Sequence, residues 1–125
     1  MRLRRGLILM VATILTACAT GGGDGVARRR ANLITEAELV ESNTLDAYQA
    51  IRRLRPNWLT TRAGMEDAVV HIDGIRLNGI NDMRDIQVST LREMAYLTGP
   101  DATTRYGTGY RGGLIDLKSK GTRGG

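Results

Sequence analysis

The sequence predicts a small α+β domain, in which short helices are interspersed among the strands of one β-sheet. Three observations lead to this expectation. Residues 69–73 alternate in the manner of a strand buried on one face, and the dipeptide Asp73-Gly74 after them is the signal of a two-residue hairpin turn. Upstream, Thr35 and Glu38 have the spacing of a helix capping box. Downstream, residues 114–118 form a second apolar segment, which we expect to be the closing strand with Ile115 and Leu117 facing inward.

Length and composition limit the size of this domain. The chain has 125 residues, which allows one small domain with a modest core. Because Phe is absent and there is a single Trp, the core is expected to consist mainly of Leu, Ile, Val, Ala and Met.

The N-terminal residues have the pattern of an export signal. A positive segment, formed by Arg2, Arg4 and Arg5, precedes an apolar stretch at 6–17 that is too short for a permanent membrane span. We therefore expect residues 1–17 to be a signal peptide.

The end of this segment resembles the bacterial lipobox. In the motif Leu15-Thr16-Ala17-Cys18, cleavage before the cysteine would leave a lipid-modified N-terminus. A lone cysteine forms no intramolecular disulfide, so we expect lipidation of Cys18 and a firm anchor of several acyl chains. The alternative is an ordinary signal peptide with an incidental cysteine. Residue 19 is Ala rather than Asp, and the resemblance to lipoproteins therefore implies the periplasmic face of the outer membrane.

The net charge gives no argument for nucleic-acid binding. Removal of three of the 18 basic residues with the signal leaves 15 basic against 13 acidic residues, a net charge of +2. Residues 18–31 are glycine-rich without apolar periodicity, and we expect a lipidated cysteine followed by a flexible linker. Two roles fit the cluster Arg28-Arg29-Arg30: contact with anionic lipid headgroups, and solubilising charge on a loop.

The folded domain is expected at residues 32–120, followed by a tail at 121–125. The capping box begins a first helix that ends near Glu41, and Asn43 or Thr44 is expected to cap a second. Pro56 ends this second helix, because it pushes Arg55 out of the α region. The inward stripe of the second helix is expected to comprise Leu45, Tyr48, Ile51 and Leu54.

The remaining elements follow from helix-capping residues and prolines. We expect a brief strand at 58–61, with the Trp58 indole covering the edge of the core, and a short helix at 89–93 capped by Ser89 or Thr90. Residues 94–98 are expected to form a strand. Pro100 can open a further helix to residue 105, because its missing N–H would have no partner at this position.

Five short motifs follow one another along the chain: Ile72-Asp73-Gly74, Leu91-Arg92-Glu93-Met94, Gly99-Pro100, Tyr106-Gly107 and Gly112-Gly113-Leu114-Ile115. In this order they resemble the plug domain of TonB-dependent outer-membrane receptors. The resemblance covers the chain after residue 31 and implies a small mixed β-sheet with short helices packed on it. It also implies a non-enzymatic binding module accessory to TonB-dependent uptake, whose partner is an envelope protein such as a TonB-dependent receptor or a TonB-type energiser.

The sequence departs from the plug pattern in three respects. Thr98 stands where plugs commonly have Arg before Gly-Pro, and no TonB box is recognisable at 19–32. The sequence after the domain is too short for a β-barrel, so we expect a plug-like domain without its own barrel.

Enzymatic and cofactor motifs are weak. Residues 107–112 match G-x-G-x-x-G, but a β-rich segment follows instead of the helix that a dinucleotide site needs. His71 is the only histidine, and no serine lies in a G-x-S-x-G elbow. We therefore expect a structural or surface role for His71 and predict no catalytic residue, metal ligand or cofactor.

Surface recognition is the favoured activity. Tyr110, Arg111 and Arg105 are candidates for an interaction surface, because Tyr and Arg often supply binding energy at interfaces. Tyr106 is expected to pack under the sheet. Two alternatives stay open: a structural or small-ligand-sequestering periplasmic lipoprotein, and a small periplasmic hydrolase that uses His71.

Overall fold

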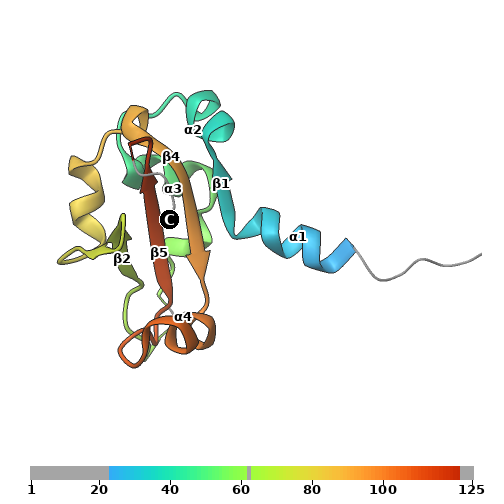
Figure 1. The fold of residues 1–125 in the computed structure, drawn as a ribbon, viewed down its shortest axis with the longest axis vertical. Helices are drawn as coiled ribbons and strands as arrows, with labels where there is room; N and C mark the ends of the chain where they lie inside the picture. The colour runs from blue at the N-terminus through green and yellow to red at the C-terminus, as the bar shows by residue number, and fades with distance from the viewer. Residues whose placement is uncertain (1–22, 62, 122–125) are drawn as a thin grey trace, which may run out of the picture.

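The fold is a five-stranded mixed sheet with short helices around it, in a computed structural model that describes residues 23–61 and 63–121 (Figure 1). The strand order is β1-β4-β5-β2-β3, and only the β2–β5 pair is parallel. This confirms the predicted class, a small mixed α+β fold. The strands are β1 (Leu33–Thr35), β2 (Val69–Ile72), β3 (Ile75–Arg76), β4 (Leu91–Leu97) and β5 (Leu114–Ser119).

Four α-helices and three 3₁₀ helices complete the described part of the chain. In Figure 1, α3 lies behind the sheet, α4 lies at one end of it, and α1 extends away from it beside β1. Among the described residues, no helix has the length and apolar character needed to cross a bilayer. The helices are α1 (Gly23–Ala31), α2 (Glu36–Ser42), α3 (Ala47–Leu54), α4 (Gly99–Tyr106), η1 (Pro56–Leu59), η2 (Ile80–Asp85) and η3 (Val88–Thr90).

The central strand β5 is buried on both faces. Ile115 and Leu117 belong to the larger core cluster, together with Ile51 of α3, while Leu114 packs with Ala102 of α4 on the other face. The predicted inward orientation of Ile115 and Leu117 is therefore confirmed. Since β5 pairs with both β4 and β2, it connects the two halves of the sheet.

Several local predictions are confirmed. Asp73 and Gly74 have φ angles of 50° and 85°, as a two-residue hairpin with a type I′ turn requires. Thr35 and Glu38 form the reciprocal capping box of α2. Arg55 has φ −142° and ψ 61°, so the residue before Pro56 leaves the α region and α3 ends.

The expected linker is wrong for residues 23–31, because this segment is helix α1. The first eighteen residues, with the predicted signal peptide and Cys18, lie outside the described residues. So does most of the predicted tail.

The second helix begins later than predicted. Its N-cap is Asp46, whose Oδ1 accepts a hydrogen bond of 2.8 Å from the Gln49 amide, whereas Asn43 has a left-handed conformation and ends α2. Leu45 therefore lies before the helix and is 83% exposed. The buried face of α3 instead comprises Ala47, Ala50 and Ile51.

Two other elements differ in type or position. The predicted strand at 58–61 is absent: residues 58 and 59 belong to the 3₁₀ helix η1, which Pro56 opens, and residues 60 and 61 have no regular secondary structure. Trp58 is buried in the main core instead of at its edge. The predicted helix at 89–93 is replaced by the single turn η3. Strand β4 begins at Leu91 because this segment pairs with β5 along its length.

Candidate functional site

The glycine motifs of the plug-like segment meet at one end of the sheet. A Cβ atom on Gly99, the first residue of α4, would lie 2.7 Å from the Arg111 carbonyl oxygen. A Cβ on Gly112 would lie 2.1 Å from the Glu66 carbonyl oxygen. Only glycine tolerates such distances, so these two residues let three segments of backbone pack directly against one another.

These segments enclose a groove, here named the Arg111 groove and lined by Met65, Glu66, Gly99, Pro100 and Arg111. It consists of two adjoining hollows of about 560 and 480 Å³ that share these five residues. Volumes of this size are typical of sites that hold a small molecule or a few peptide residues.

An aromatic pair forms part of the wall of the second hollow. The Trp58 and Tyr96 rings stack with their centroids 5.8 Å apart and an interplanar angle of 22°. The Tyr96 hydroxyl donates a hydrogen bond of 3.2 Å to the Gly112 carbonyl oxygen. Trp58 is only 3% exposed and packs in the main core, so the core fixes the position of the Tyr96 ring in this wall.

The rim of the groove is charged. Arg111 and Glu66 are exposed, and neither side chain forms an ion pair or hydrogen bond within residues 23–61 and 63–121. The N-terminal end of α4, capped by Thr98, lies beside them, and the Asp101 carboxylate in its first turn offsets the partial positive charge of the helix end. Met65, 50% exposed, supplies apolar surface. This arrangement can hold a ligand by stacking and hydrogen bonds, with Arg111 facing an anionic group.

The predicted interaction residues do not form one surface. Arg111 lines the groove, whereas Arg105 is exposed on the last turn of α4 and does not line it. Tyr110 is only 8% exposed and packs with Leu114 in the smaller core cluster, so its assignment to the surface is wrong. Conversely, Tyr106 is 45% exposed, and the prediction that it packs under the sheet is also wrong.

His71 lies on the same face of the sheet as this smaller cluster. Its ring is 5% exposed and lies 5.5 Å from the Tyr106 ring and 5.8 Å from the Tyr110 ring, between centroids. Nε2 is 3.4 Å from the Tyr110 hydroxyl, and the buried Nδ1 has no hydrogen-bond partner. Burial lowers the pKa of His71, the carboxylate of Asp116 opposes this, and the positive charge of Arg76 adds to it.

An ion pair on β5 lies beside the histidine. Asp116 is opposite His71 in the β2–β5 register and pairs with Lys118 at 3.0 Å. The hydrogen bond to Asp116 raises the pKa of Lys118. His71 is therefore packed between two tyrosine rings and an ion pair of the neighbouring strand.

Sequence reasoning missed Met65 and Glu66 as groove residues. Both lie in the loop before β2, and neither has a local motif. The one available signal is the pair of glycine motifs, since glycine permits close backbone approach, but the motifs do not identify the segment approached.

Comparison with known proteins gives no identification. No protein-family model matches the chain, and no match to a curated protein was found.

Proposed function

We propose that this chain is a lipid-anchored protein of the periplasmic face of the outer membrane, whose plug-like domain binds another envelope protein without catalysing a reaction. One observation carries the proposal: Gly99-Pro100 and Gly112-Gly113, two of the motifs behind the resemblance to TonB-dependent receptor plugs, build the Arg111 groove together. The proposed role is accessory to TonB-dependent uptake.

The groove suits an extended segment of a partner protein. Tyr and Arg provide much of the binding energy at protein interfaces, and the groove combines the half-buried Tyr96 and the exposed Arg111 with apolar Met65 and Pro100. The apolar surface and the Tyr96 ring, which Trp58 supports from the core, would hold side chains of the segment, and Arg111 would pair with one of its acidic residues.

Affinity capture from solubilised outer membrane tests this proposal. After cross-linking in the cell, we expect the wild-type protein to recover a defined envelope protein, and Arg111→Glu to recover at least tenfold less, because loss of an interface arginine of this kind costs about 2 kcal/mol or more. Arg105→Glu is the matched control, since it makes the same charge change at an exposed residue outside the groove. Equal recovery with Arg111→Glu, or no envelope protein with the wild type, would contradict the proposal.

The second candidate is a lipoprotein that sequesters a small ligand. The volume of each hollow favours it, since both lie in the range of small-molecule sites. This candidate predicts normal uptake after gene deletion, together with a small molecule that native mass spectrometry detects on the wild-type protein and not on Arg111→Glu.

A further inference from the structure

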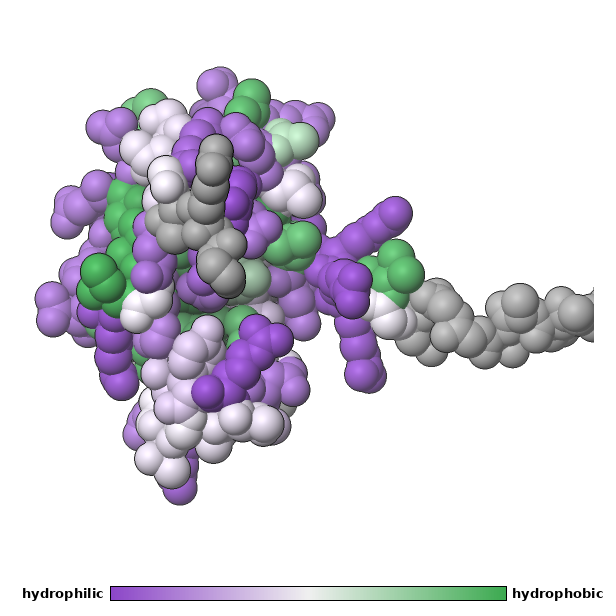
Figure 2. Space-filling view, in the orientation of Figure 1, coloured by the Kyte–Doolittle hydropathy of each residue, from purple (hydrophilic) through white to green (hydrophobic). Residues whose placement is uncertain are grey.

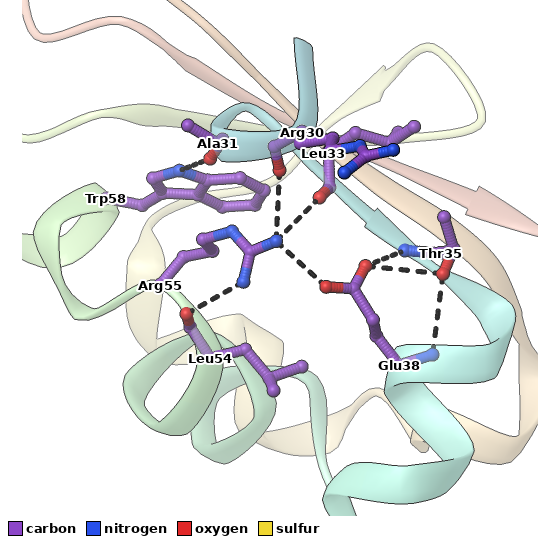
Figure 3. A network of polar contacts seen from close by, with 8 residues as sticks. All are labelled: Arg30, Ala31, Leu33, Thr35, Glu38, Leu54, Arg55 and Trp58. Atoms are coloured by element: carbon purple, nitrogen blue, oxygen red, sulfur yellow. Dashed lines mark hydrogen bonds and ion pairs between the residues drawn. The ribbon is translucent and has the colours of Figure 1, made fainter. Parts of the chain in front are cut away.

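Helix α1 is held on the domain by side chains from a distant part of the chain (Figure 3). Arg55 Nη2 donates to the carbonyl oxygens of Arg30 at 3.0 Å and Leu33 at 3.3 Å. Trp58 Nε1 donates to the Ala31 carbonyl oxygen at 3.3 Å. Carbonyl groups at the C-terminus of a helix lack hydrogen-bond partners within the helix. Arg55 and Trp58 provide donors to two of these carbonyls, those of Arg30 and Ala31. The last turn of α1 therefore has a defined position on the domain.

The same turn carries three consecutive arginines. Arg28, Arg29 and Arg30 are exposed, and the ion pairs of the described residues involve other side chains. In Figure 2, hydrophilic side chains radiate from the segment that Figure 1 labels α1. Since residues in a helix are about 100° apart, Arg29 and Arg30 lie on one face with Val26, and Arg28 lies on the opposite face.

The face of Arg29 and Arg30 borders a mostly apolar hollow of about 470 Å³, here named the α1 groove. Its apolar lining includes Val26 and Leu33. Arg55 also lines it, but its guanidinium is occupied by the carbonyls described above and by Glu38 at 2.9 Å. The charges left for an external group are therefore those of Arg29 and Arg30, beside an apolar surface.

We propose that the α1 groove binds an anionic phospholipid of the membrane surface. The lipid phosphate would pair with Arg29 and Arg30, while Val26 and Leu33 would contact its glycerol and upper acyl region. This rests on the proposed lipid anchor: Cys18 is five residues before α1, and five residues span at most about 18 Å, so the anchor keeps α1 close to the bilayer. Glu38 does not repel the lipid, since its charge is compensated by Arg55.

Binding would fix the orientation of the domain on the membrane. The contacts of Arg55 and Trp58 transmit the position of α1 to α3 and η1, and Trp58 also lines the Arg111 groove. A lipid anchor at one residue does not by itself fix the orientation of the domain on the membrane. With α1 bound, the Arg111 groove would face a fixed direction relative to the bilayer.

Hydrogen–deuterium exchange of the α1 amides tests the proposal. The full chain, purified from bacterial membranes, would be incorporated into vesicles of phosphatidylcholine alone or with 30% phosphatidylglycerol. Each basic residue near an anionic surface strengthens binding about fivefold, so two predict exchange about 25-fold slower in the anionic vesicles. The difference should disappear in 1 M salt, where the screening length is about 3 Å.

Two matched double variants test whether Arg29 and Arg30 are the residues that bind the lipid. Arg29→Gln/Arg30→Gln should abolish the difference, whereas Arg52→Gln/Arg53→Gln should retain it, because that pair is also exposed and adjacent in the last turn of a helix. Equal slowing in Arg29→Gln/Arg30→Gln, or no difference between vesicles for the wild type, would overturn the proposal. Flotation with phosphatidylcholine vesicles reports the anchor separately. A chain that fails to float but still shows slowed α1 exchange would refute the anchor and retain the lipid site.

Discussion

Replacing Gly112 with alanine tests the backbone packing on which the Arg111 groove depends. The new Cβ would lie 2.1 Å from the Glu66 carbonyl oxygen and 2.5 Å from that of Asp67. Both contacts are with backbone, so no side chain can rotate away and the loop before β2 must move by more than 1 Å to restore ordinary van der Waals distances of about 3.4 Å. Overpacking of this kind costs about 1–3 kcal/mol, and we expect the upper end. For a domain of this size, about 3 kcal/mol lowers Tm by roughly 10–20 °C.

Urea and thermal unfolding followed by circular dichroism measure this effect. Gly79→Ala is the matched control, because Gly79 is extended, at φ 176°, and no atom lies within 4 Å of a Cβ built there. The control should change the free energy of unfolding by about 1 kcal/mol or less, in the stabilising direction if at all. If the two variants have the same urea midpoint, the three segments do not pack as described and the groove has no structural basis.

Three further predictions concern other parts of the chain. Asp46→Ala removes the N-cap of α3 and should lower the free energy of unfolding by about 1 kcal/mol in urea titrations. The pKa of His71 is lowered in the fold, so its stabilising contribution is complete above the unfolded value of about 6.5 and is lost as the pH falls below it. The urea midpoint of the wild type should therefore fall between pH 7.5 and pH 5.5 more than that of His71→Phe; parallel profiles would show that His71 does not titrate differently on folding. Cys18→Ser should release the protein from the membrane fraction or leave it unprocessed, and labelling by a fatty-acid analogue that survives the substitution would refute lipidation at this residue.

The elements that sequence reasoning predicted correctly are those decided by local backbone chemistry. Asp73-Gly74 must turn because both residues adopt positive φ, and the capping box of Thr35 and Glu38 needs only a spacing of three. Pro100 opens a helix for the same local reason, since its missing N–H has no partner at a helix start. None of these depends on contacts with distant residues.

The elements that were missed depend on distant contacts or on closely competing local choices. Helix α1 has no apolar periodicity, and the groups that cap its C-terminal carbonyls are Arg55 and Trp58, 25 and 27 residues away from their acceptors. The N-cap of α3 is Asp46 instead of the expected Asn43 or Thr44. Asn43 is not available for this role because its left-handed backbone conformation ends α2. Residues 65 and 66 line the groove only because Gly112 lets the backbone approach them, which sequence alone does not show.

Trp58 connects the two candidate surfaces of this protein. Its indole N–H holds the end of α1, its ring stacks on Tyr96, and the Tyr96 hydroxyl in turn holds the Gly112 carbonyl at the Arg111 groove. Trp58 is 3% exposed, its N–H is hydrogen-bonded and its ring is stacked, so this side chain has little freedom to move. Displacement of α1 would therefore disturb the wall of the Arg111 groove, and an occupied groove would oppose such displacement. Under the two proposals made above, this connection would couple the position of α1 at the membrane to the position of the Arg111 groove.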